Sequence, residues 1–121
     1  MFQDRRQRRP SLLGCAGGLL AAAAIGLAAY ASHGAQGHVQ ANLHTAALYA
    51  FGHGVALATL SGGTLRNLGR AALYALLFGT LLFCGSLVAG ALAGFSTRAA
   101  PIGGVTMMLA WVAWAIDALR R

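Results

Sequence analysis

The sequence predicts an all-α integral membrane protein, a bundle of four transmembrane helices with both termini in the cytoplasm. The composition is the first indication, because 58% of the 121 residues are hydrophobic and 9% are charged, whereas soluble domains carry about 25% charged residues. The second is that long uncharged stretches alternate with short segments that contain arginine. Since a helix needs about 20 apolar residues to cross the hydrocarbon core, the chain has room for four spans and short loops.

The predicted organisation is a basic cytoplasmic leader, residues 1–10, followed by a single membrane domain, residues 11–121. Pro10 and Ser11 suit the start of the first helix, and Gly62-Gly63 suits the end of the second. Pro101 is typical of the first turn of a helix and opens the fourth. The predicted spans are 11–32, 44–61, 71–95 and 101–118.

The first span also resembles a secretory signal peptide. Basic residues precede it, and Ala29-Tyr30-Ala31 has the form of an A-x-A cleavage site. The apolar stretch 11–32 is longer than the usual h-region of about 7–15 residues. We therefore expect this segment to stay in the membrane and to close the bundle.

The arginines predict the orientation of the bundle. Cationic residues in short loops remain on the cytoplasmic side, and eight of the nine arginines fall on one side if the four stretches span. These eight are Arg5, Arg6, Arg8, Arg9, Arg66, Arg70, Arg120 and Arg121. Arg98 lies in the external turn between the third and fourth spans. The protein is therefore expected in a bacterial-type inner membrane, as a multi-pass protein.

Several function classes are disfavoured by the same pattern. Nucleic-acid binding is not expected, because the arginines flank apolar stretches instead of lining one solvated face. Cys15 and Cys84 are isolated within apolar segments, which indicates buried thiols and no disulfide or metal framework. The chain contains no nucleophile–base motif and no paired intramembrane carboxylates. We therefore expect no catalytic residues, no metal and no cofactor.

His53 is the most informative polar residue inside the predicted spans. It lies near the middle of the second span, where a polar side chain faces the bundle interior and requires a partner. Tyr49 precedes it by one helical turn, and Thr80, Cys84 and Ser86 of the third span reach comparable depth. A neutral His53 that is hydrogen-bonded to one of these groups is the favoured interpretation. A proton relay or ligand contact and, less favoured, a metal site remain open.

Small residues recur every four positions in two spans and therefore line one helix face in each. The sets are Gly14, Gly18, Ala22 and Gly26 in the first span, and Ser86, Gly90 and Gly94 in the third. Such faces allow close approach of helices in lipid. They predict packing within the bundle or, alternatively, a seam between copies. Gly103-Gly104 has two readings as well, close helix packing or an anion site at a helix N-terminus.

Four blocks of the chain, in order, resemble the YgdD-like small inner-membrane proteins, a family of unknown function also called domain of unknown function 423. The blocks are Ala28–Gly34, Thr45-Ala46 with Tyr49 and His53, Phe83–Leu87, and Pro101–Gly104 with Trp111 beyond. Cys84 and Ala100 depart from the family pattern. The resemblance implies four spans and brings no substrate. It adds His33, Tyr49, His53, Gly85, Ser86, Pro101 and Gly103 as motif residues.

The leading functional interpretation is a non-enzymatic membrane protein that packs with or modulates lipids or partner membrane proteins. Membrane lipid, a homo-oligomer or a larger membrane-protein complex are the expected partners. The alternative is a small transporter or channel component with an intramembrane histidine site. The candidate polar or ligand site comprises His33, Tyr49, His53, Ser86, Gly103 and Gly104. Transport requires a water-accessible cavity at His53, whereas a scaffold requires a dry bundle with His53 fully paired.

Overall fold

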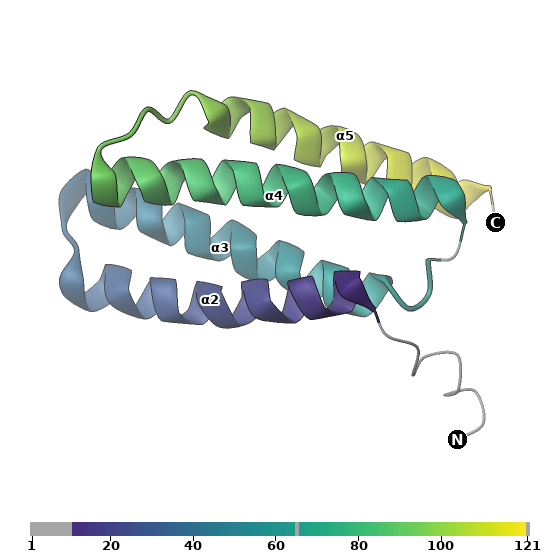
Figure 1. Ribbon diagram of the computed structural model, residues 1–121, viewed down its shortest axis with the longest axis horizontal. Helices are drawn as coiled ribbons and strands as arrows, with labels where there is room; N and C mark the ends of the chain where they lie inside the picture. The colour runs from purple at the N-terminus through teal and green to yellow at the C-terminus, as the bar shows by residue number, and fades with distance from the viewer. Residues whose placement is uncertain (1–10, 65, 121) are drawn as a thin grey trace, which may run out of the picture.

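The computed structural model describes residues 11–64 and 66–120, and these residues form four helices. The helices are α2 (Leu12–Gly34), α3 (Gly37–Leu60), α4 (Asn67–Ala93) and α5 (Ala99–Leu119). Successive helices run in opposite directions, so α2 begins and α5 ends at the same end of the bundle (Figure 1). The all-α, four-helix prediction is therefore confirmed. The predicted leader 1–10, with its four arginines, and Arg121 lie outside the described residues.

The bundle is built from two helical hairpins. α2 packs mainly on α3, α4 packs mainly on α5, and the pair α3–α4 joins the hairpins. Between α3 and α5, no two Cα atoms of the described residues come within 8 Å. The gap between these two helices is bridged by side chains. It is where the candidate site described below lies.

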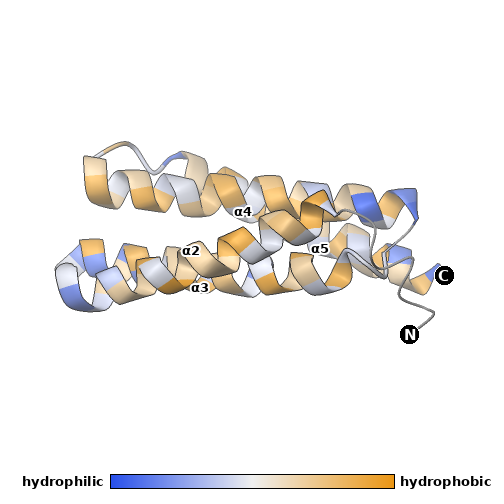
Figure 2. Cartoon of the chain, turned by 60° about the horizontal axis from the view of Figure 1, so that its bottom comes forward, coloured by the Kyte–Doolittle hydropathy of each residue, from blue (hydrophilic) through white to orange (hydrophobic). Residues whose placement is uncertain are grey.

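The outer surface of the bundle carries many large apolar side chains. α2, α4 and α5 are long and apolar enough to cross a membrane, and no more than 22% of the residues in their apolar windows are buried. Large side chains such as Leu19, Phe78 and Leu109 are more than 60% exposed. Hydrophilic residues gather toward the ends of the bundle in Figure 2. Three such helices indicate a multi-pass membrane protein.

The second predicted span, which corresponds to α3, falls outside this group of apolar helices. Its first two turns carry His38, Gln40, Asn42 and His44, and His53 follows further along. These polar side chains lower the hydropathy of the helix although it has 24 residues. Of the four predicted spans, three are matched by described helices that are long and apolar enough to cross a membrane.

The first connection is shorter than predicted, because α3 begins at Gly37 and not at residue 44. Gly37 has φ of 63°, a left-handed conformation that favours glycine, and it lets the chain reverse over two residues. The Gln40 amide donates a hydrogen bond of 3.0 Å to the Ala31 carbonyl across the turn. His38 and His44 remain exposed on the helix. Residues 37–43, which the prediction placed in the connection before the second span, therefore belong to the first turns of α3.

The other predicted helix boundaries differ from the observed ones by at most four residues. α4 begins at Asn67, four residues before the prediction, and ends where Gly94 adopts φ of 74° and caps the helix. Gly94 is therefore a helix terminator, as expected for a left-handed cap, and not part of a packing face. α5 begins at Ala99, so Pro101 is the third residue of the helix, where its missing N–H is tolerated.

Of the glycines at the helix crossings, Gly103 was predicted to pack closely, whereas Gly17, Gly54 and Gly79 were not. A Cβ at Gly17 would lie 2.5 Å from the Gly54 carbonyl oxygen, so α2 and α3 cross with backbone against backbone. Gly79 and Gly103 have the same role between α4 and α5. A glycine at these points lets the helix axes approach closely.

Most of the small residues predicted to form a packing face on α2 do not face a neighbouring helix. Gly18, Ala22 and Gly26 are exposed, and a Cβ at Gly18 or Gly26 would meet no atom within 4 Å. Packing within the bundle is therefore wrong for these three residues. Gly14 lies beside Ser61, and Gly90 lies against Thr97 of the following turn. The physical reason is register, since one residue of offset turns a helix by 100°.

The arginines of the described chain separate between the two ends of the bundle. Arg66 precedes α4, Arg70 lies in its first turn, and Arg120 follows α5. These three lie at the end where α2 begins (Figure 1). Arg98 precedes α5 and lies at the opposite end. The grouping agrees with the spacing of the arginines in the sequence.

Candidate functional site

A file of aromatic rings crosses from α4 through α3 to α5. Phe83 meets Tyr49 edge-on with ring centroids 5.0 Å apart, and Tyr49 stacks on His53 at 5.9 Å. His53 faces Trp111 at 5.9 Å, and Trp111 meets Trp114 edge-on at 6.2 Å. These side chains span the gap in which the backbones of α3 and α5 do not touch. The file therefore holds the two hairpins together on this side.

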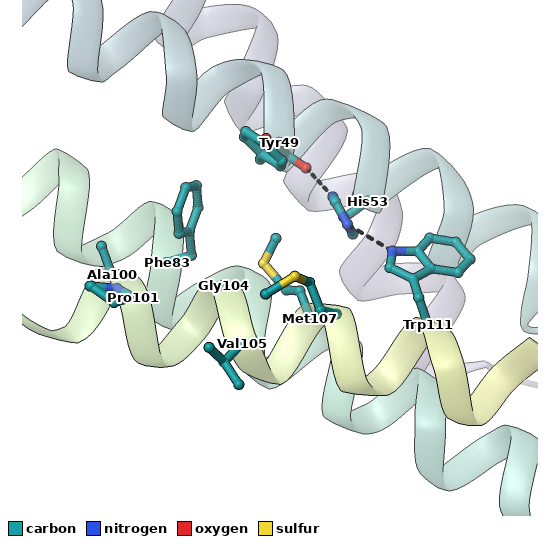
Figure 3. A pocket seen from close by; sticks show the side chains of 10 residues that line it. Tyr49, His53, Phe83, Ala100, Pro101, Gly104, Val105, Met107 and Trp111 are labelled. Carbon is teal, nitrogen blue, oxygen red and sulfur yellow. Dashed lines mark hydrogen bonds between the residues drawn. The ribbon is translucent and has the colours of Figure 1, made fainter.

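Both ring nitrogens of His53 are hydrogen-bonded within the chain. The Trp111 indole Nε1–H donates to His53 Nε2 over 3.1 Å, and His53 Nδ1 lies 2.8 Å from the Tyr49 carbonyl oxygen. An indole nitrogen is a donor only, so Nε2 accepts and Nδ1 must carry the hydrogen that the carbonyl receives. Figure 3 shows the imidazole held between these two partners. This arrangement selects the neutral Nδ1–H tautomer.

A groove of about 570 Å³ lies beside His53, between α3 and α5. Its lining residues are almost entirely apolar and come from three helices (Figure 3): Tyr49, His53, Phe83, Ala100, Pro101, Gly104, Val105, Met107, Met108 and Trp111. The groove is not enclosed, because Val105 and Met108 are 49% and 61% exposed on the outer face of the bundle. It extends along α5 from Ala100 to Trp111, which are eleven steps of 1.5 Å apart, or about 16 Å.

The partners predicted for His53 on the third span do not bond to it in the described structure. The Thr80 hydroxyl donates to the Leu76 carbonyl in its own helix at 2.7 Å. The Cys84 thiol points toward α3 and reaches the Ala46 carbonyl at 3.3 Å. The Ser86 hydroxyl is buried and has no hydrogen-bond partner among the described residues. The prediction that α4 pairs with His53 is therefore wrong, since α5 supplies the donor.

The structure brings together part of the predicted candidate site. Tyr49, His53 and Gly104 line the groove, and Gly103 packs behind it against the backbone of Phe83. His33 does not join them, because it is exposed in the last turn of α2, a helix that has no close contact with α5. Among the described residues, no group of three or more His, Cys, Asp or Glu could hold a metal ion.

Gly103 and Gly104 have different roles although they are adjacent. A Cβ at Gly103 would lie 2.5 Å from the Phe83 backbone nitrogen, which requires glycine for the crossing of α4 and α5. A Cβ at Gly104 would meet the Phe83 ring at 3.8 Å, an ordinary contact. Close packing therefore accounts for Gly103, whereas Gly104 leaves space in the groove.

A second polar cluster closes the end of the bundle where the arginines gather. The Asp117 side chain is 1% exposed, and its Oδ1 lies 3.7 Å from Arg66 Nε. Arg66 also donates to the Arg120 carbonyl at 2.6 Å, and the Trp114 indole donates to the Thr64 hydroxyl at 3.2 Å. These contacts tie the segment before α4 to the end of α5.

Trp111 is the main site residue that the sequence analysis did not assign. The depth argument used for the third span applies equally to the fourth, where Trp111 lies midway along the helix. An indole N–H at that depth has no water to bond and usually finds an acceptor, and His53 is an acceptor at similar depth. The depth of Trp111 in its helix is therefore the signal in the sequence that points to its pairing with His53.

Comparison with known proteins gives one match. No curated protein and no solved structure matches the chain. The model of a family described as a protein of unknown function, DUF423, matches residues 27–104. The matched region includes Tyr49, His53, Phe83 and Gly104 of the groove and ends before Trp111. Since the match covers more than half of the chain and agrees with the resemblance seen in the sequence, the chain belongs to the DUF423 family.

Proposed function

We propose that this chain is a non-enzymatic, four-span protein of a bacterial-type inner membrane that associates with membrane lipid, with both termini in the cytoplasm. The observation that carries the lipid assignment is the apolar groove beside a fully hydrogen-bonded His53. Among the residues that the structure describes, no charged side chain lines this groove. An apolar molecule gains from such a site, whereas an ion finds no described side chain of opposite charge that offsets the loss of its hydration.

The four-span topology is supported by the path of the chain. α2 and α4 run in the same direction (Figure 1), so the segment between them must return across the bilayer if both helices span. α3 has 24 residues, about 36 Å at 1.5 Å per residue, which exceeds the roughly 30 Å of hydrocarbon. Arg66, Arg70 and Arg120 at one end favour that end as cytoplasmic.

Single cysteines introduced at the two ends test this orientation. In a background without Cys15 and Cys84, we expect Gln36→Cys to react with a membrane-impermeant maleimide in spheroplasts. Gly62→Cys lies at the opposite end, is exposed, and is expected to react only after the membrane is permeabilised. Labelling of Gly62→Cys in intact spheroplasts, with protection of Gln36→Cys, would reverse the proposed orientation.

Association with lipid is tested on the purified protein. We expect phospholipid to remain bound after extraction in mild detergent, detected by native mass spectrometry. We also expect the thermal midpoint of the delipidated protein to rise when phospholipid is added back, because a ligand that binds the folded state stabilises it. Detergent micelles without protein are the control. Absence of both retained lipid and stabilisation would contradict the proposal.

A transporter or channel component is the second candidate, because the groove reaches His53. This candidate requires His53 to exchange its present partners for a transported proton or solute. In proteoliposomes, His53→Gln would then abolish a flux that the unchanged chain supports. Under the lipid proposal, neither protein supports a flux above that of empty vesicles.

A further inference from the structure

We propose that the groove between α3 and α5 holds one acyl chain of an anionic phospholipid, with the lipid phosphate at Arg98. The inference rests on the proposed association with lipid. It specifies where the lipid binds, that an acyl chain enters the groove, and that the headgroup is anionic. Three features of the structure support it: the shape of the groove, the two hydrogen bonds that engage His53 in its wall, and the positive charge two residues before its end.

The shape of the groove suits a flexible apolar chain. Its volume of about 570 Å³ lies within the range of roughly 300–1,000 Å³ that is typical of sites for small ligands. A helix with its side chains is about 10–12 Å across, and docking one would need a broad face and not a single groove of this volume. The exposed Val105 and Met108 open the groove sideways toward lipid.

The wall of the groove offers apolar contact and no vacant polar partner at His53. Both imidazole nitrogens are used within the chain, so His53 presents its ring and not a free donor or acceptor. Met107 and Met108 contribute flexible thioether side chains, which adapt to ligands of irregular shape. The occupant of this stretch is therefore a hydrocarbon chain.

The charge at the end of the groove identifies the headgroup. Ala100 and Pro101 line that end, and Arg98 lies two residues earlier, at the N-terminus of α5. Arg98 is exposed, and within the described residues its guanidinium makes no ion pair. Arginine matches phosphate oxygens with charge-assisted hydrogen bonds. A chain that enters the groove from this end would leave its phosphate beside Arg98.

Quenching of Trp111 fluorescence by a brominated acyl chain tests the site directly. The chain has two tryptophans, and Trp114→Phe leaves Trp111, which lines the groove, as the single reporter. In vesicles of phosphatidylcholine, we expect phosphatidylglycerol with brominated chains to quench Trp111 saturably. Unbrominated phosphatidylglycerol is expected to compete for this quenching. Quenching that grows only in proportion to bulk bromine would overturn the proposal.

Filling the groove should remove the saturable quenching. Gly104→Leu places a side chain in the groove, and its Cβ meets only the Phe83 ring. The matched control is Gly85→Leu, because a Cβ at Gly85 would meet no atom within 4 Å and Gly85 does not line the groove. We expect at least about a tenfold weaker apparent affinity, the equivalent of 1.4 kcal/mol, for Gly104→Leu and no change for the control. If Gly104→Leu does not fold, Val105→Phe provides the same test.

The headgroup contact is tested by removing the charge of one arginine, either beside the groove entrance or at the opposite end of the bundle. One arginine near the bilayer surface contributes about 1 kcal/mol toward an anionic lipid, so Arg98→Gln should weaken phosphatidylglycerol binding about fivefold. Arg70→Gln at the opposite end is the matched control and should have no effect. Equal effects of the two changes would overturn the headgroup assignment.

The proposal and the underlying function fail in distinguishable ways. If lipid is retained and stabilises the protein while Gly104→Leu and Val105→Phe bind it as well as the unchanged chain, the protein associates with lipid elsewhere. If no lipid is retained by any variant and none stabilises the protein, the lipid function itself is wrong.

Discussion

Replacing Gly17 by alanine is expected to lower the free energy of unfolding by about 1–3 kcal/mol, the usual effect of overpacking. The added Cβ would lie 2.5 Å from the Gly54 carbonyl oxygen and 2.7 Å from the Ala58 backbone nitrogen. Neither atom belongs to a flexible side chain, so α2 and α3 must move apart along their crossing. Unfolding in mixed micelles of increasing SDS content, followed by circular dichroism, measures the change.

Gly18→Ala is the matched control, because the two glycines are adjacent and a Cβ at Gly18 meets nothing within 4 Å. We expect its effect to stay within about 0.5 kcal/mol or to be slightly stabilising, since alanine favours a helix interior over glycine. Equal destabilisation by both changes would contradict the described crossing. If Gly18→Ala also changes the mass of the protein–detergent complex, the face of Gly18, Ala22 and Gly26 is a seam between copies.

Loss of the indole donor in Trp111→Phe is expected to destabilise the bundle by about 0.6–2 kcal/mol, the range for hydrogen bonds between membrane helices. The change leaves His53 Nε2 without its 3.1 Å partner, at a depth where no water replaces it. In a double-mutant cycle with His53→Leu, the coupling energy should account for most of this loss, because the second change removes the orphaned acceptor.

Trp114→Phe supplies the control cycle, since Trp114 donates to Thr64 and not to His53. Its effect should add to that of His53→Leu within about 0.5 kcal/mol. An NMR spectrum of ¹⁵N-labelled indole gives a second readout, in which His53→Leu shifts the Trp111 Nε1–H resonance far more than that of Trp114. Additivity in both cycles, with neither resonance shifted, would mean that Trp111 and His53 do not interact.

The helices were predictable because their causes are local. Uncharged stretches of helical length indicate spans wherever they occur, and glycine or proline at their ends is a local signal. The boundary that was wrong, the start of α3 at Gly37, depended on how polar residues are exposed once α2 and α3 pack. Hydropathy alone does not distinguish a polar loop from the polar first turns of a helix.

The candidate site was predictable only in part. A histidine deep in a span requires a partner wherever the helix lies, and this singled out His53. The choice of Trp111 over Thr80 or Cys84 depended on the rotation of α5 about its axis, which places the indole toward α3. The rotation of α2 about its own axis likewise placed Gly17 at a crossing and left Gly18 exposed. A single residue of offset turns a side chain by 100°, and no local signal determines that angle.

The sequence by itself determined that the chain forms apolar helices, that arginines separate the two ends, and that His53 needs a partner. The tertiary structure decided which partner it has, which glycines face a neighbouring helix, and that a groove remains between α3 and α5. The physical reason is that apolar length and charge are properties of each segment. Helix rotation and register arise only when the four segments pack against one another.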